Sequence, residues 1–291
     1  MPVMKKMALF NGGKLMLSAN SRVDLHLHST ASDGVRTLQE IIQEALGQGV
    51  ELIALTDHDT MRNTQEFNDL VKQAGLLSIK GMEVSALIQD QVVHILGYGL
   101  DPNSSAVQQY TEYYQQSEKR SDLRTIARLR LHGYQVSEED YTCYVYNPRR
   151  GCWKLCAYLM DKGVVKYFAE YCAFQTQGLI ENPQYWSAGE VISMIHQAQG
   201  KAVIAHIFDY QKDDPRALLD QLRYLGLDGI ECFHSHHNKD LAQALCEYAQ
   251  KYHLLITGGS DDHGHLPDRK MGSPAILYGQ LKLGSLIDKI D

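Results

Sequence analysis

The sequence predicts an α/β protein in which a closed or nearly closed barrel of strands carries a mostly helical insertion. Short apolar runs alternate with helical patterns in residues 22–100 and again in residues 188–279. Such alternation favours a parallel sheet, and about eight strands over this length favour a barrel over an open sheet. In residues 101–187 the alternation stops, because Tyr, Gln, Arg and Leu recur there at helical spacing.

The first half of the barrel is predicted from period-2 runs separated by helix signals. Val23 to His28 alternates Val or Leu with Asp or His, which indicates a strand. Thr37 and Glu40 form a capping-box pattern, and the helix that they begin ends near Gly47 and Gly49. The sequence then predicts a strand at 51–56, a helix at 63–74, and strands at 77–85 and 91–96.

The second half of the barrel follows the insertion. The sequence predicts helices at 188–199, 215–225 and 239–252 and strands at 201–206, 227–234, 254–259 and 273–278. We therefore expect a barrel domain made of residues 1–100 and 188–291 and a helical insertion domain made of residues 101–187.

Composition and charge narrow the class of protein. The 28 Lys and Arg residues against 35 Asp and Glu residues give a net charge of −7, which argues against binding of long nucleic acid through its phosphates. A local site for a small anion remains compatible with that charge. The apolar stretch after Lys5 and Lys6 is too short for a signal peptide, and no run of about 18 apolar residues predicts a membrane span. We expect a cytoplasmic protein with reduced cysteines and no membrane partner.

The chain contains 13 histidines, and many of them fall at or near the ends of predicted strands. In a β/α barrel the carboxyl ends of the strands form the face on which active sites are built. His26 and His28 are two apart, so both imidazoles point to the same side of their strand. Asp261 and His263 repeat this spacing, and Gly259 before them allows a close approach of the backbone. Mixed imidazole and carboxylate ligands suit Zn, Mn or Fe.

Clustered divalent cations favour phosphoester chemistry, because two cations lower the pKa of a water between them and stabilise charge on the attacking and leaving oxygens. The sequence has none of the glycine-rich or serine motifs of P-loop enzymes, serine hydrolases or dinucleotide-binding proteins.

Six ordered motifs in residues 22–100 and 188–279 resemble the polymerase and histidinol phosphatase (PHP) family. The motifs are Asp24-Leu-His-Leu-His-Ser29 with Ser32-Asp33-Gly34, Thr56-Asp57-His58-Asp59, Gly81-Met-Glu83, His94-Ile-Leu-Gly-Tyr98, Ala205-His206 and Gly259-Ser-Asp261-Asp-His263. The resemblance implies a distorted, TIM-like (β/α)7 barrel that holds two or three divalent metal ions.

The resemblance also implies a ligand set. One ion is expected on His26, His28, Glu83 and Asp261, a second on Glu83, His94 and His206, and a third on Asp33, His58 and His263. Direct roles in catalysis are expected for Asp33, His58, Glu83 and His206.

The insertion is similar to that of the branch with nucleoside 3′,5′-bisphosphate phosphatases and short-RNA 5′ exonucleases. Where that branch usually has Arg-Pro-His, this chain has Arg149-Arg150-Gly-Cys-Trp153-Lys154, and Ile207 stands where Pro usually follows the Ala-His motif. We expect the insertion to act as a lid that carries phosphate-binding cations. The candidate substrate-binding residues are Arg120, Arg124, Arg150, Lys154 and His234. Arg120, Arg124 and Arg128 also fit a solvated helix face, which remains the alternative.

These observations predict a metal-dependent phosphoesterase that removes phosphate from a small phosphorylated metabolite, with a nucleotide favoured, by attack of a metal-activated water. A 5′-3′ exonuclease acting on short oligonucleotides is one alternative, and a metal-dependent amidohydrolase is another. A third is a non-enzymatic domain of the kind associated with polymerases.

Overall fold

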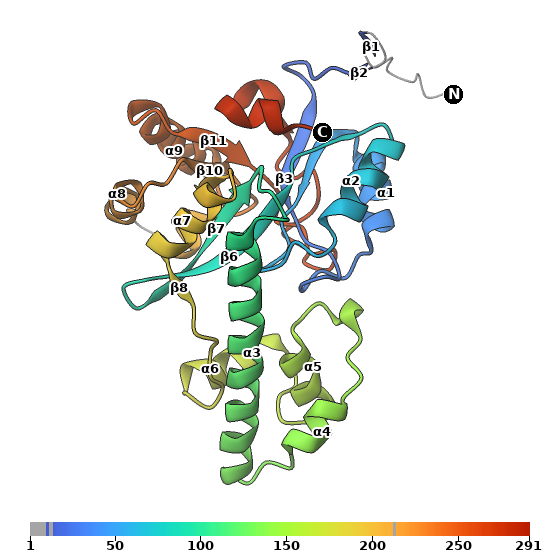
Figure 1. The fold of residues 1–291 in the computed structure, drawn as a ribbon, viewed down its shortest axis with the longest axis vertical. Coiled ribbons are helices and arrows are strands. Elements are labelled where there is room, and N and C mark those ends of the chain that lie inside the picture. Colours follow the sequence, from blue (N-terminus) through green and yellow to red (C-terminus); the bar gives the residue numbers. More distant parts are fainter. Residues whose placement is uncertain (1–9, 12–13, 212–213) are drawn as a thin grey trace.

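The computed structural model describes residues 10–11, 14–211 and 214–291, and most of its strands form two sheets (Figure 1). The four-stranded sheet has the order β12-β3-β4-β5, with β3 Arg22–Leu27, β4 Val50–Leu55, β5 Leu77–Ser78 and β12 Ile276–Leu277. The six-stranded sheet has the order β11-β10-β9-β7-β6-β8, with β6 Gly81–Ile88, β7 Gln91–Tyr98, β8 Trp186–Ser187, β9 Lys201–Ile204, β10 Gly229–Phe233 and β11 Leu255–Gly258. A separate pair is formed by β1 Phe10–Asn11 and β2 Lys14–Leu15.

The helices around the sheets follow the predicted order. They are α1 Leu38–Gln48, α2 Thr64–Gln73, α7 Ala188–Gln197, α8 Arg216–Tyr224 and α9 Lys239–Lys251. The predicted capping box of α1 is confirmed, because Thr37 Oγ1 accepts a hydrogen bond from the backbone N–H of Glu40 while the Glu40 carboxylate accepts one from that of Thr37. Short 3-10 helices lie at Pro148–Arg150, Ile207–Asp209, Tyr278–Gln280 and Gly284–Lys289.

The expectation of a parallel sheet is wrong for two strands. Pairs β3–β4, β4–β5, β9–β10 and β10–β11 are parallel, but β7 runs antiparallel to both β6 and β9, and β12 runs antiparallel to β3. Only Gln89 and Asp90 separate β6 from β7, and a parallel partner needs a much longer crossover.

The predicted strand at 77–85 is two strands in different sheets. β5 pairs with β4 in the four-stranded sheet, and β6 pairs with β7 and β8 in the six-stranded sheet. The interruption at Ile79 and Lys80 lets the chain pass from one sheet to the other.

The two sheets are joined at the strand ends that carry the histidines. The backbone N–H of His28 donates to the carbonyl of Asp262 at 3.0 Å, and that of Asp59 donates to the carbonyl of Glu83 at 2.8 Å. The backbone N–H of Asp261 donates to the carbonyl of His26 at 3.0 Å. These hydrogen bonds bring segments that are distant in the sequence to one edge of the fold.

The insertion consists of α3 Ser105–Leu131, α4 Glu138–Cys143, α5 Lys154–Asp161 and α6 Phe168–Thr176. Its buried residues form a hydrophobic cluster of their own, to which α3 contributes Ile126 and Leu129. The beginning of α3 contributes Val107 and Tyr110 to a second hydrophobic cluster, which includes residues of the six-stranded sheet. Figure 1 shows α3 extending from the sheets into the group formed by α4, α5 and α6.

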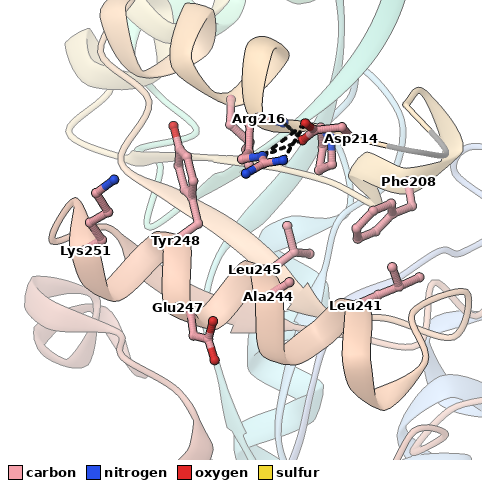
Figure 2. A pocket seen from close by; sticks show the side chains of 11 residues that line it. Phe208, Asp214, Arg216, Leu241, Ala244, Leu245, Glu247, Tyr248 and Lys251 are labelled. Carbon is pink, nitrogen blue, oxygen red and sulfur yellow. Dashed lines mark hydrogen bonds and ion pairs between the residues drawn. The ribbon is translucent and has the colours of Figure 1, made fainter.

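A surface groove of about 490 Å³ lies between α8 and α9 (Figure 2). Leu219, Leu245 and Tyr248 supply much of its apolar lining, and Arg216 makes an ion pair with Asp214 at its rim. The groove shares no lining residue with the histidine cluster described below. Among the described helices, none is long and apolar enough to cross a membrane.

Candidate metal centre

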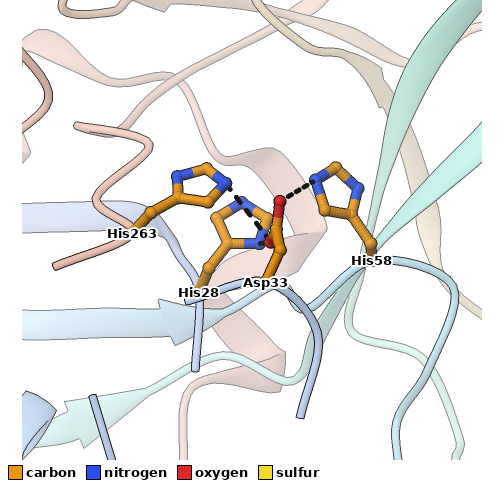
Figure 3. A group of neighbouring side chains, drawn as sticks. All are labelled: His28, Asp33, His58 and His263. Atoms are coloured by element: carbon orange, nitrogen blue, oxygen red, sulfur yellow. Dashed lines mark ion pairs between the residues drawn. The ribbon is translucent and has the colours of Figure 1, made fainter. Parts of the chain in front are cut away.

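Imidazoles and carboxylates from five of the strands or the loops after them meet at one edge of the sheets. Their ligand atoms fall into three groups within which all atoms lie within 4.8 Å of one another. The groups are His28, Asp33, His58 and His263 (Figure 3), then His26, His28, Glu83 and Asp261, and finally His58, Glu83 and His94. His28, His58 and Glu83 each belong to two groups, so the three groups form one continuous cluster.

Glu83 lies at the centre of this cluster. Its Oε2 atom is 2.9 Å from Nε2 of His26 and 3.1 Å from Nε2 of His28. Its Oε1 atom is 2.9 Å from Nδ1 of His94 and 2.9 Å from Nε2 of His206. The two carboxylate oxygens therefore lie within 3.1 Å of four imidazoles, which come from β3, the residue after β3, β7 and the segment after β9.

Local backbone structure explains how the groups come so close. Gly259 packs directly against β3, because a Cβ atom placed there would lie 2.3 Å from Cβ of His26. The close approach predicted from the glycine is thereby confirmed. His206 and Asp261 adopt positive φ angles of 24° and 57°, in the left-handed region that residues with side chains rarely occupy. Such backbone strain is concentrated at functional sites in proteins.

The donor set fits divalent cations. Several buried ligand atoms have no hydrogen-bond partner among the described residues, although buried polar atoms nearly always have one. These atoms are Nδ1 and Nε2 of His28, Oδ1 of Asp33, Nδ1 of His94, Nδ1 of His206 and Oδ1 of Asp261. Divalent cations would satisfy the imidazole lone pairs and the carboxylate charges together, so the residues present suit mixed nitrogen and oxygen coordination.

The electrostatics of the cluster follow from burial and from the neighbouring charges. Burial lowers the pKa of His58 to about 3, so this imidazole is neutral at neutral pH and has a free lone pair. Burial also opposes the charged form of His28, but the carboxylates of Asp261 and Glu83, at 3.0 and 3.1 Å from its Nε2 atom, raise its pKa to about 10. Burial disfavours the charge of Glu83, and the surrounding histidines nevertheless hold its pKa well below the usual value. Glu83 therefore remains an anion inside the fold.

Glu231 belongs to the site and was not predicted from the sequence. Its fully buried carboxylate lies 3.0 Å from Nδ1 of His26 and accepts a hydrogen bond from the backbone N–H of His206 at 2.9 Å. The one available signal is an acidic residue inside the apolar strand β10. Arg269 was also missed, and it makes ion pairs with Asp261 and Asp209.

The structure places His234 beside the cluster. Its side chain is fully buried, with Nε2 at 3.5 Å from Oδ2 of Asp261. Its Nδ1 atom accepts a hydrogen bond from the backbone N–H of His236 at 3.1 Å. His234 therefore faces the ligand set through Asp261.

The predicted phosphate-binding arginines are not gathered at the cluster. Arg124 pairs with Glu181, and Arg150 pairs with Asp161 at 2.7 Å. Arg120 is exposed on α3. Lys154 differs, because it lines a cavity that His58 also lines.

Two cavities adjoin the cluster on the side of the insertion. One of about 130 Å³ is lined by His58 and His94, and another of about 200 Å³ is lined by His58, Arg62 and Lys154. Tyr114, Glu118 and Trp153 of the insertion line both cavities. The ring of Trp153 lies with its centroid 6.2 Å from that of His58. A substrate bound at the cluster would therefore contact the insertion.

Comparison with known proteins identifies relatives along most of the chain. A phosphoribosyl 1,2-cyclic phosphate 1,2-diphosphodiesterase from Eggerthella lenta is 31% identical over 254 residues, which are 83% of this chain and 94% of the relative. A 5′-3′ exoribonuclease from Haemophilus influenzae is 27% identical over 93% of this chain and 96% of its own length. A 3′,5′-nucleoside bisphosphate phosphatase from Chromobacterium violaceum is 29% identical over 84% of this chain and 87% of its own length.

Solved structures share the fold. A metal-dependent phosphoesterase structure from Bifidobacterium adolescentis superposes with a TM-score of 0.71 at 25% identity and covers 94% of this chain and 96% of its own. A structure from Chromobacterium violaceum is described as an amidohydrolase with bound sulfate and no metal. It has a TM-score of 0.72 at 26% identity and covers 92% of this chain and 97% of its own. The model of the PHP domain family matches residues 24–270. The chain therefore belongs to the PHP family and is a metal-dependent hydrolase of phosphoester bonds.

Proposed function

We propose that this protein removes a phosphate group from a small phosphorylated nucleotide with the help of two or three divalent cations such as Zn, Mn or Fe. The observation that carries the proposal is the position of Glu83, whose two carboxylate oxygens lie within 3.1 Å of four imidazoles. A carboxylate so placed is suited to join neighbouring cations. Divalent cations held by these residues would supply an activated water and neutralise the charge that develops on the phosphate oxygens.

The ligand sets that we propose are those expected from the family resemblance. His26, His28, Glu83 and Asp261 hold one ion, Glu83, His94 and His206 hold the second, and Asp33, His58 and His263 hold the third. The three groups of ligand atoms in the structure support the first and third sets, and His206 joins the second set through its 2.9 Å contact with Glu83. We propose that Asp33, His58, Glu83 and His206 act directly in catalysis.

The cavities beside the cluster support a small substrate. Their volumes of about 130 Å³ and 200 Å³ suit part of a nucleotide each, and Arg62 and Lys154 provide positive charge for an anionic group in the larger one. The phosphatase relative acts on a nucleoside bisphosphate, and the relative from Eggerthella lenta acts on a cyclic phosphate of a phosphoribosyl group. The net charge of −7 adds repulsion for each further phosphate of a long strand.

Exonuclease activity on short RNA is the second candidate, because the exoribonuclease relative aligns over 93% of this chain. Rates on three substrates at one ionic strength separate the two candidates. The substrates are a nucleoside 3′,5′-bisphosphate, a sugar phosphate and a 5′-phosphorylated oligonucleotide, each with Mn- and Zn-loaded protein. We expect the bisphosphate to be hydrolysed fastest. An oligonucleotide rate at least tenfold higher would replace the phosphatase proposal with the exonuclease.

The sheets also support a finer description of the architecture. We propose that the two bridged sheets correspond to the distorted, TIM-like (β/α)7 barrel of the family. In the same proposal, residues 1–100 and 188–291 form this domain and residues 101–187 form the insertion domain. The hydrogen bonds between the sheets at His28 and Asp59 support the first part, and the separate hydrophobic cluster of the insertion supports the second.

A further inference from the structure

Glu118 on α3 lines cavities beside the metal centre, and its side chain has no partner within the described part of the chain. It lines both cavities that adjoin the cluster, and its side chain is partly buried. No described residue donates a hydrogen bond to its carboxylate or forms an ion pair with it. The pKa of Glu118 is raised to about 7, mainly by burial and further by the nearby charges of Asp122 and Asp59.

The other carboxylates that line the smaller cavity differ from Glu118, because each has a donor. Asp59 accepts hydrogen bonds from the backbone N–H and the hydroxyl of Ser85, both at 2.8 Å, and from Tyr110. Asp122 accepts a hydrogen bond from the hydroxyl of Tyr141. Glu181 pairs with Arg124 and Arg128. The fold thus supplies donors for its neighbours and leaves the carboxylate of Glu118 to a ligand.

Aromatic rings flank this carboxylate along both cavities. Tyr114, one turn before Glu118 on α3, packs with its ring centroid 6.3 Å from that of Tyr185. Trp153 lines the same two cavities, and its ring centroid lies 6.2 Å from that of His58 in the cluster. Flat apolar faces next to a hydrogen-bond acceptor suit a ring that carries N–H or O–H groups.

We propose that Glu118 determines specificity by accepting hydrogen bonds from donor groups on the organic part of the substrate, while Tyr114 and Trp153 pack against that part. This inference rests on the proposed function, because it places the phosphate at the cluster and the remainder of the substrate against the insertion. A nucleoside carries hydrogen-bond donors in two places, namely the hydroxyl groups of its sugar and the amino or imino groups of its base. The carboxylate repels phosphate, so it contacts an uncharged part of the substrate, while Arg62 and Lys154 face any anionic group in the larger cavity.

The experiment compares the wild-type protein with Glu118→Ala and Glu118→Gln. Glu112→Ala is the matched control, because Glu112 is exposed on the same helix and lines neither cavity. Specificity constants are measured for a nucleoside 3′,5′-bisphosphate, ribose 5-phosphate and p-nitrophenyl phosphate, which lacks donors. Circular dichroism and metal content establish that each variant is folded and loaded.

We expect Glu118→Ala to lower the specificity constant for the bisphosphate about 10- to 100-fold more than that for p-nitrophenyl phosphate, the size expected for a lost charged hydrogen bond. Glu118→Gln retains an acceptor oxygen without the charge, so its loss is smaller. A comparable loss with ribose 5-phosphate assigns the donors to the sugar, whereas a loss confined to the nucleotide assigns them to the base. Equal losses on all three substrates, or no loss, would overturn the proposal.

Calorimetric binding of a nucleoside monophosphate provides a measurement that does not depend on turnover. We expect Glu118→Ala to bind the nucleotide at least tenfold more weakly than Glu112→Ala does. If the wild-type protein hydrolyses none of the three phosphoesters, the proposed function is wrong. The binding measurement still decides the role of Glu118 in that case, and equal affinities of the two variants count against it.

Discussion

The carboxylate of Glu231 lies 3.0 Å from Nδ1 of His26 and so fixes the imidazole that faces Glu83 with its other nitrogen. A carboxylate in this position favours the tautomer with the proton on Nδ1 and leaves the Nε2 lone pair for a metal ion. We expect Glu231→Gln to weaken metal binding about 10- to 100-fold. Competition with a chromophoric chelator measures this, with the exposed Glu247→Gln as control. An unchanged affinity would mean that Glu231 serves packing alone.

Metal content tests the cluster itself. After reconstitution with Mn or Zn, we expect elemental analysis to find two or three ions per chain, because the ligand atoms form three overlapping groups. Glu83→Gln should lose at least one ion and retain less than about a tenth of the activity, since a neutral amide cannot balance two cations. Less than one equivalent in the wild-type protein, or full activity in the variant, contradicts the bridging role.

Gly259 allows the loop after β11 to pack against His26, so a methyl group there should be costly. We expect Gly259→Ala to lower the melting temperature and the metal content, because its Cβ would meet backbone and Cβ atoms of His26 at 2.3 to 2.9 Å. Gly47→Ala is the control, since nothing lies within 4 Å of its added Cβ in α1. That substitution should be neutral or stabilise the helix by up to about 1 kcal/mol. Equal melting temperatures would disprove the close approach.

Lys154 and Arg124 should differ in their effect on catalysis. Lys154 lines the cavity that it shares with His58, whereas Arg124 is engaged by Glu181. We expect Lys154→Ala to lower the specificity constant for a nucleoside bisphosphate about tenfold or more, and Arg124→Ala to change it by less than about threefold. Steady-state kinetics at fixed metal content measure both. A larger effect of Arg124→Ala would restore the arginines of α3 as the phosphate-binding group.

The raised pKa of Glu118 predicts a pH dependence of stability. Burial, with Asp122 and Asp59 nearby, raises this pKa from 4.5 to about 7. The folded protein therefore holds a proton that the unfolded chain releases in this range, and the free energy of unfolding contributed by Glu118 falls as the pH rises from 4.5 to 7. Urea titrations of wild type and Glu118→Gln at several pH values isolate the contribution. As the pH rises, the free energy of unfolding of Glu118→Gln should increase relative to that of the wild-type protein. A difference between the two proteins that does not change with pH would refute this prediction.

Sequence periodicity was sufficient to predict that His26 and His28 lie on the same side of one strand, whereas Glu83 was expected from the family resemblance. The period-2 spacing of His26 and His28 places both side chains against Glu83, as a strand requires. The antiparallel direction of β7 could not be predicted in the same way, because the turn at Gln89 and Asp90 contains no glycine or proline that would indicate a tight hairpin.

Contacts between residues that are distant in the sequence could not be predicted from the sequence. The arginines of α3 have the spacing of a phosphate clamp, but Glu181, 57 residues after Arg124, occupies that arginine in the fold. Glu231 similarly appears in the sequence as one acidic residue in a short strand, and only packing against His26 shows that it is buried. Charge pairing of this kind depends on tertiary contacts that no local pattern specifies.

The length of α3 has a consequence for how substrate enters and product leaves. One uninterrupted helix belongs to both hydrophobic clusters, through Val107 at one end and Leu129 at the other. Tyr110 on the same helix also donates its hydroxyl to Asp59, next to His58 of the metal centre. Swinging the insertion away would require breaking the helix or extracting this buried tyrosine. We therefore expect the insertion to stay in place during turnover, so that substrate and product exchange through side-chain motion at the cavity mouths.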